Sequence, residues 1–189
     1  MTEPYLTLGS PRFADTRLGK LARTQGPLAA WREAVRTLAR SAPIGVTGDF
    51  AVGFHEPGGR VFLAVDRFAI QTLCYRLDNS GLRFAERADA LADGADIDPQ
   101  AIFDYLYFHV IPSPRTIYKG VYRLPPGHCA LFEGGQLTVE PYWSPAFEEA
   151  RAPSFDGLKN EFREILRAAV ATQLDDSKAA CFLSGGTDS

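Results

Sequence analysis

The sequence predicts an α+β domain built on antiparallel sheets, followed by the beginning of an α/β domain. Apolar residues alternate along paired stretches that glycine-rich or polar turns separate, at residues 50–65, 72–85 and 129–139. This pattern is typical of β-hairpins, and three hairpins favour antiparallel sheets. Near the end of the sequence, the unbroken apolar run Ala179–Leu183 follows a long amphipathic stretch, which is the order in which a parallel α/β sheet begins.

Two helices are expected within the first domain. Apolar residues recur at helical spacing over residues 28–39. A second helix begins at Asp98, a favourable N-cap residue, with Pro99 at its first helical position. We expect three aromatic residues of this second helix to lie in the core: Tyr105, Tyr107 and Phe108.

A change in composition marks a domain boundary near residue 145. Residues 144–153 carry two prolines and mixed charge, as linkers do, and Ser154 can then cap a long helix. The apolar stripe of that helix consists of Phe155, Leu158, Phe162, Ile165, Leu166, Ala169 and Val170. We therefore expect domains at residues 1–145 and 146–189, the second of them incomplete.

Composition excludes several classes of partner. The net charge of −3 offers no electrostatic attraction for nucleic acid or for an anionic membrane. No apolar run approaches the roughly 20 residues that a membrane-spanning helix needs. Three widely spaced cysteines, Cys74, Cys129 and Cys181, fit neither a disulfide framework nor a metal motif, so we expect buried thiols in a cytoplasmic protein.

The last six residues carry the chemistry that the sequence predicts. They are Ser184, Gly185, Gly186, Thr187, Asp188 and Ser189, and they directly follow the apolar run. Paired glycines let backbone N–H groups approach a phosphate, and the three hydroxyl groups can add donors. A carboxylate beside phosphate favours a bridging Mg²⁺, so Asp188 is the expected metal ligand and ATP the expected nucleotide. A glycine turn without any ligand remains the alternative.

Three stretches resemble the asparagine synthetase family. The final hexapeptide resembles the SGGxDS pyrophosphate loop of N-type ATP pyrophosphatases, which lacks the lysine of a kinase P-loop. Residues 48–51 and 65–75 resemble the family pattern G-x-F-A followed by R-D-R-F-G-I-x-P-L-Y-Y. Residues 111–128 resemble the segment that closes the N-terminal domain of these enzymes.

This resemblance implies a fold and a reaction. The fold would be a degenerate glutamine-amidotransferase sandwich of the N-terminal-nucleophile type, followed by the first helix and strand of a nucleotide-binding domain of the pyrophosphatase-loop (PP-loop) class. The reaction would be adenylation of a small-molecule or peptide carboxylate by Mg²⁺-ATP, then attack by ammonia or another amine donor. We expect the sequence to stop inside the nucleotide loop, so that the fragment alone would be inactive. A homodimer is left open.

The sequence also departs from the family pattern. Glutamine-hydrolysing members begin Met-Cys-Gly, whereas position 2 here is Thr2, and the Asn-Gly-Glu segment that holds glutamine is missing. We therefore expect no glutaminase nucleophile and no catalytic residue in the first domain. Two alternatives stay open: a cyclase that closes an intramolecular amide, as lasso-peptide or β-lactam synthetases do, and a non-catalytic scaffold. Asp66 and Arg67, at a strand end, are expected to form a structural ion pair or an interface.

Overall fold

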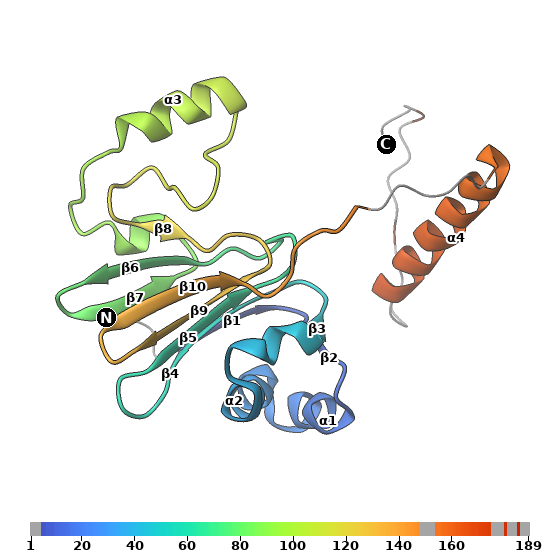
Figure 1. Ribbon diagram of the computed structural model, residues 1–189, viewed down its shortest axis with the longest axis horizontal. Helices are drawn as coiled ribbons and strands as arrows, with labels where there is room; N and C mark the ends of the chain where they lie inside the picture. The colour runs from blue at the N-terminus through green and yellow to red at the C-terminus, as the bar shows by residue number, and fades with distance from the viewer. Residues whose placement is uncertain (1–4, 148–153, 175–179, 181–184, 186–189) are drawn as a thin grey trace. The chain divides into compact units, whose positions relative to one another are not determined.

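The computed structural model describes residues 5–147, 154–174, 180 and 185, and divides the chain into two compact units, Met1–Pro145 and Ala146–Ser189. Sheets and helices alternate along unit 1, whereas a single helix is described in unit 2 (Figure 1). In unit 1 the strands are β1 Tyr5–Gly9, β2 Arg12–Phe13, β3 Val46–Thr47, β4 Phe50–His55, β5 Val61–Val65, β6 Cys74–Asp78, β7 Gly81–Ala85, β8 Tyr122–Arg123, β9 His128–Glu133 and β10 Gln136–Pro141. The helices are α1 Thr16–Gln25, α2 Pro27–Leu38 and α3 Pro99–Phe108, with 3-10 helices η1 Ala39–Gly45 and η2 Ala88–Leu91.

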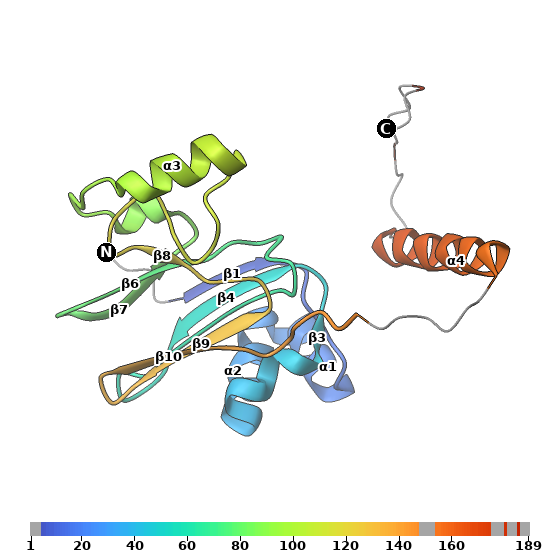
Figure 2. The same ribbon diagram turned by 45° about the horizontal axis from the view of Figure 1, so that its top comes forward.

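Unit 1 is a three-layer arrangement around a central antiparallel sheet. The central sheet has five strands in the order β1-β4-β5-β9-β10, and a second sheet has the order β7-β6-β8. Helices α1 and α2 cover one face of the central sheet, and the second sheet covers the other face, as both views show (Figures 1 and 2). The predicted mixed fold with antiparallel hairpins is confirmed for this unit.

The central strands are buried on both faces because layers cover both sides of the sheet. Along β4, Phe50, Val52 and Phe54 join the core cluster that contains Trp31 of α2. The intervening Ala51 joins the opposite cluster, which contains residues of the second sheet. The alternation along the sequence predicted the hairpin, and the second layer is why both faces of β4 are buried.

The predicted hairpins and capped helices are present. Helix α2 occupies the expected segment, and Asp98 caps α3 by accepting a hydrogen bond from the Gln100 N–H at 3.0 Å. Strand β1, helix α1 and the short pairs that include β2, β3 and β8 lay outside the sequence-based expectations. Helix α1 was missed because its ten residues include few apolar side chains, so tertiary packing of Leu18 rather than periodicity stabilises it.

Unit 2 consists, as far as it is described, of helix α4 Phe155–Gln173 and a few flanking residues. The Ser154 hydroxyl caps the helix by accepting from the Gly157 N–H at 3.2 Å, as predicted. The predicted strand Ala179–Leu183 lies outside the described residues, apart from Ala180. None of the helices in the described ranges is both long enough and apolar enough to cross a membrane.

The contact between the two sheets makes a prediction about Gly53. A Cβ atom at this position would lie 2.8 Å from two ring atoms of Phe84 and 3.0 Å from the Leu63 side chain. We expect Gly53→Ala to lower the free energy of unfolding by about 1–3 kcal/mol, because the ring would have to move out of a packed interface. Urea unfolding followed by the fluorescence of Trp31 and Trp143 measures this change.

Gly45→Ala is the matched control, because no atom lies within 4 Å of a Cβ at that position. Its unfolding free energy is expected to stay level or to rise by about 0.4–1 kcal/mol, through the reduced entropy of the unfolded chain. Equal stability changes in the two variants would contradict the tight sheet-to-sheet contact at Gly53.

Candidate functional site

The carboxylate of Asp66 organises the segment that carries the second family resemblance. The side chain is 2% exposed and follows directly after β5. It accepts four backbone hydrogen bonds, from the N–H groups of Phe50 at 3.2 Å, Phe68 at 3.0 Å, Ile70 at 3.2 Å and Gln71 at 3.1 Å. An ionised carboxylate has about four acceptor positions, so this buried charge is satisfied.

The main chain of Asp66 extends the same network to two further segments. Its N–H donates to the Phe50 carbonyl at 2.8 Å, and its carbonyl accepts from the Gly127 N–H at 3.0 Å. Asp66 therefore joins the start of β4, the loop 67–71 and the Pro-Pro-Gly turn at residues 125–127. The stretches that resemble the family at residues 48–51, 65–75 and 111–128 are thus brought together in space.

The expected ion pair between Asp66 and Arg67 is wrong. Consecutive side chains at a strand end point in opposite directions, so Asp66 points inward to backbone N–H groups and Arg67 does not face it. The Arg67 guanidinium instead lies over the Trp143 ring, 5.7 Å from its centroid, and Phe68 meets the same ring edge-on at 5.4 Å. The Asp66 carboxylate has backbone amides as its partners instead, and the alternative of an interface role stays a prediction.

A second carboxylate supports the network from the side. The Gln71 amide donates to Asp49 Oδ2 at 2.8 Å, and this hydrogen bond holds the pKa of Asp49 below its ordinary value. The Asp49 carbonyl accepts from the Ser10 N–H at 2.8 Å, just after β1. A Cβ at Gly9 would lie 2.3 Å from that carbonyl oxygen, so only glycine permits this approach.

The loop that Asp66 fixes presents apolar side chains to solvent. Phe68 and Ile70 are 71% and 67% exposed. Between them, Ala69 has a φ of 50°, in the left-handed region where the family pattern has glycine. Such a conformation costs of order 1 kcal/mol or more in a residue that carries a Cβ, and the amides bound to Asp66 hold it in place.

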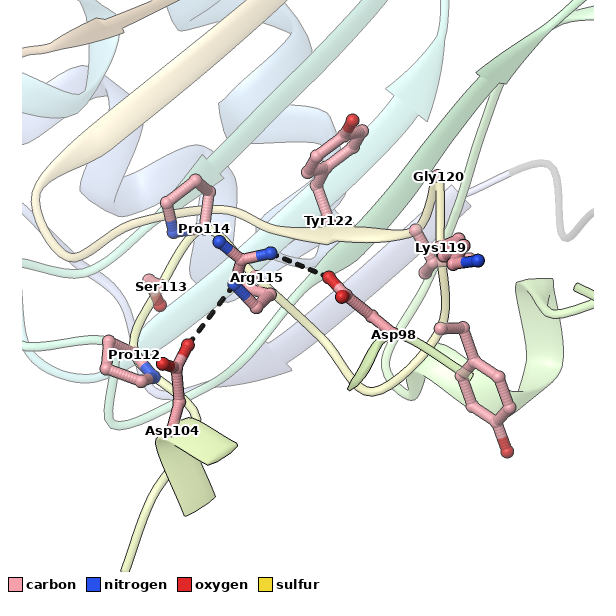
Figure 3. Close-up of a pocket in the computed structure, with 11 residues that line it drawn as sticks. Asp98, Asp104, Pro112, Ser113, Pro114, Arg115, Lys119, Gly120 and Tyr122 are labelled. Atoms are coloured by element: carbon pink, nitrogen blue, oxygen red, sulfur yellow. Dashed lines mark hydrogen bonds and ion pairs between the residues drawn. The ribbon is translucent and has the colours of Figure 1, made fainter. Parts of the chain in front are cut away.

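A cavity of about 460 Å³, with both charged and apolar residues in its lining, lies against the third resembling segment (Figure 3). Figure 3 shows Arg115 at its centre, where the guanidinium contacts the carboxylates of Asp98 at 2.6 Å and Asp104 at 3.2 Å. The hydrogen bond from Arg115 holds the pKa of Asp98 below its ordinary value. Since Asp98 caps α3, this cluster joins the helix to the segment 112–122. Its charges are already paired with one another, so it serves as a support.

The cysteines in the described ranges lack the properties of a nucleophile. Cys74 is 3% exposed and Cys129 is 0% exposed, which confirms the expectation for these two. Burial raises the pKa of both thiols, and that of Cys129 reaches about 11. A nucleophilic cysteine needs an accessible thiolate near neutral pH, so neither residue fits that role. Cys181 and Thr2 lie outside the described residues.

The predicted nucleotide loop falls almost entirely outside the described residues. Of the six residues, only Gly185 is described, with a φ of 76°, which is a conformation that favours glycine. Ser184, Gly186, Thr187, Asp188 and Ser189 lie outside, so the loop and its Mg²⁺ ligand stay a prediction. Within the described part of the chain, no group of three or more His, Cys, Asp or Glu side chains could hold a metal ion.

Sequence reasoning missed two features of this region. The Tyr142 hydroxyl donates to the Val65 carbonyl at 2.7 Å, next to Asp66, and burial raises the pKa of this tyrosine. The pairing of Arg115 with Asp98 joins residues 17 positions apart in the sequence. An aspartate directly after an unbroken apolar strand was the available signal for the Asp66 network, whereas no local pattern points to the other two contacts.

Comparison with known proteins places these features in a family context. Residues 33–143 match the family model described as a glutamine amidotransferase domain. A glutamine-hydrolyzing asparagine synthetase of Bacillus subtilis (strain 168) is 29% identical over 131 residues, covering 67% of this chain and 21% of the relative. The chain thus spans about a fifth of that protein's length. These matches confirm the resemblance to asparagine synthetases.

Two solved structures align with part of this chain. The glutamine phosphoribosylpyrophosphate amidotransferase of B. subtilis, complexed with ADP and GMP, aligns with 75% of this chain and 30% of its own, at 11% identity and a TM-score of 0.42. A structure described as the allosteric regulatory enzyme of purine biosynthesis aligns with 75% of this chain and 29% of its own, at 11% identity and a TM-score of 0.45.

Asp66→Asn tests the backbone network. The asparagine side chain keeps the shape but replaces one acceptor oxygen by an NH₂ group that faces the N–H groups of Phe50 and Gln71. We expect the free energy of unfolding to fall by about 3 kcal/mol or more, because buried donors lose a charged acceptor. Urea unfolding followed by tryptophan fluorescence measures the loss. The control Asp96→Asn removes an exposed carboxylate and should leave stability unchanged; a similar effect of both substitutions would refute the network.

Alkylation tests the state of the two described cysteines. In the native protein at pH 8, we expect iodoacetamide to leave Cys74 and Cys129 unmodified, because both are buried and protonated. Raising the pH to 9 should not modify Cys129, since its pKa of about 11 keeps the thiol protonated. Peptide mass spectrometry reads out each site, and unfolding in urea should expose both. Rapid native modification of either cysteine would reinstate it as a candidate nucleophile.

Proposed function

Because this chain belongs to the glutamine amidotransferase domain family, we propose that it is part of an asparagine-synthetase-like enzyme that forms amide bonds with ATP. The observation that carries this proposal is the match of residues 33–143 to the family model, together with the asparagine synthetase of B. subtilis among its relatives. Unit 1 would hold the amidotransferase fold, and residues 146–189 would begin the ATP-binding domain. The chain spans about a fifth of that relative, so the whole reaction is inferred.

We propose that the nucleophile is free ammonia or another amine, and not ammonia that the protein itself releases from glutamine. The relatives with glutaminase activity need a reactive cysteine, and both described cysteines here are buried with raised pKa values. All four partners of the Asp66 carboxylate are backbone N–H groups. The network therefore does not need a catalytic cysteine, which supports a domain that keeps its fold without glutaminase chemistry. Unit 1 then acts as a structural domain of the enzyme.

The proposed chemistry at the C-terminal loop is electrostatic. Bound Mg²⁺-ATP supplies an activated phosphoanhydride that turns a carboxylate into an acyl-adenylate and releases pyrophosphate. The backbone N–H groups at Gly185 and Gly186 would bind the departing pyrophosphate, and Asp188 would hold the Mg²⁺. Gly185 fits such a loop, because its φ of 76° is one that a residue with a Cβ adopts only under strain. Fixed donors that meet developing charge lower the barrier to adenylation.

Pyrophosphate exchange tests the amide-forming function in the protein at its natural length. With a panel of carboxylates, we expect ATP–pyrophosphate exchange that depends on one class of carboxylate. Asp188→Asn should lower the exchange rate by about 100-fold, as loss of a charge-stabilising group does at many active sites. The control Asp96→Asn, in unit 1, should leave exchange unchanged. Absence of both nucleotide binding and exchange would refute an ATP-dependent enzyme and favour a scaffold.

The choice of nitrogen donor is tested separately. Product formation should proceed with ammonia or an added amine and should not respond to glutamine, and the 189-residue chain should release no glutamate from glutamine. Turnover that depends on glutamine, and that a glutamine-site inhibitor abolishes, would overturn the proposal of an inactive glutaminase while leaving ATP-dependent amide formation intact. Product formed without any added amine would indicate an intramolecular cyclase.

A further inference from the structure

Helix α3 exposes most of its apolar and aromatic side chains. Six of its apolar or aromatic side chains, and that of Val110 just beyond its end, are between 45% and 70% exposed: Ile102, Phe103, Tyr105, Leu106, Tyr107, Phe108 and Val110. Ala101 is its only buried residue. The expectation that Tyr105, Tyr107 and Phe108 lie in the core is therefore wrong within the part of the chain that the structure describes.

The exposed side chains form a continuous surface on α3. At 100° per residue, Tyr105, Ile102, Leu106, Phe103 and Tyr107 follow one another around the helix and cover roughly 200° of its circumference. Phe103 and Tyr107 stack at 6.1 Å with an interplanar angle of 12°, and Phe108 meets Tyr107 edge-on at 4.8 Å. These stacked rings hold one another in place, so the surface is ordered before any partner binds.

The opposite side of α3, with Asp104 and the buried Ala101, and the N-cap Asp98 attach the helix to unit 1. Asp98 and Asp104 both contact Arg115, and these two aspartates are the residues of the helix and its cap that line the adjacent cavity (Figure 3). Both ribbon views place α3 at the outer edge of unit 1, beyond β8 (Figures 1 and 2). With these residues attached, the side that carries Ile102, Phe103, Tyr105, Leu106 and Tyr107 remains exposed.

The exposed area is large enough for a specific interface. From their exposed fractions, the seven side chains present on the order of 800 Å² of surface. The largest apolar patch of a typical monomer is about 300–600 Å², whereas a standard interface buries about 800 Å² on each partner. The surface is also convex, so it suits another protein surface rather than a small ligand, which binds in a concave pocket.

We propose that α3 is the contact surface of a homodimer, packed against α3 of a second copy of this chain. Two rows of side chains, Ile102–Leu106 and Phe103–Tyr107, run along the helix as neighbouring ridges with a groove between them. In a two-fold pair, a ridge of each helix enters the groove of the other, at a crossing angle near −50°. Leu106, at the middle of this surface, would lie closest to the two-fold axis.

The charge pattern supports a second copy as the partner. Between Pro99 and Pro114 the only Asp, Glu, Lys or Arg residue is Asp104, and its carboxylate contacts Arg115 at 3.2 Å. Two copies can therefore meet without opposing like charges, and aromatic residues without charges are typical of interface centres. Helix α4 differs, because six charged side chains are distributed among its apolar ones: Asp156, Lys159, Glu161, Arg163, Glu164 and Arg167.

Sedimentation equilibrium of the 189-residue chain tests the dimer. The unchanged chain should have the mass of a dimer at micromolar concentration, and Leu106→Lys should raise the dissociation constant about 30-fold or more, as loss of an interface hot spot does. Because Leu106 is 70% exposed, this substitution should leave the fold intact, which circular dichroism checks. Leu158→Lys on α4 is the matched control and should leave the dissociation constant unchanged.

A cysteine cross-link provides the second measurement. In a Cys181→Ala background, Leu106→Cys should form a disulfide-linked dimer on oxidation, whereas Leu158→Cys on α4 should not, because only residue 106 would face its own copy. A monomeric chain at all concentrations, a Leu106→Lys variant that remains a dimer, or dissociation by Leu158→Lys would overturn the proposal. Both measurements report mass alone, so their outcome is independent of the proposed enzymatic function.

Discussion

The buried carboxylate of Asp66 holds together the segments on which unit 1 depends. Four backbone N–H groups share one ionised side chain, and the main chain of the same residue reaches the Pro-Pro-Gly turn. A buried charge is costly unless it is fully hydrogen-bonded, so the surrounding loop has one conformation that satisfies it. The strained φ of Ala69 persists for the same reason. Hydrogen bonds to the Asp66 carboxylate order the loop 67–71, because its own exposed side chains pack little against the core.

Because of this arrangement, the stability of the fold does not depend on catalytic residues. Asp66 binds backbone N–H groups, which every residue except proline carries, so the network does not depend on which other side chains the loop has. A catalytic cysteine has no comparable structural task, and the two described cysteines fill space in the core. The proposal that this domain acts without a nucleophile is compatible with such a fold, and the proposed chemistry lies in the residues after position 145.

Helix α3 illustrates how an amphipathic pattern can be misinterpreted. Its aromatic residues match the composition of a core, and on that basis they were expected to be buried. The structure instead anchors the helix through the ion pairs of Arg115 with Asp98 and Asp104, which leaves the aromatic surface outside. Sequence hydrophobicity indicates that a surface will be covered, but it does not distinguish coverage within one chain from coverage by another.

Local features of this protein were determined by the sequence itself: the hairpins β4–β5, β6–β7 and β9–β10, and the caps Asp98 and Ser154. These depend on turn residues, alternation and capping groups within a few positions of one another. Tertiary structure alone decided the burial of both faces of β4, the amide partners of Asp66 and the exposure of α3. Each of these depends on contacts between segments distant in the sequence, which no local pattern encodes.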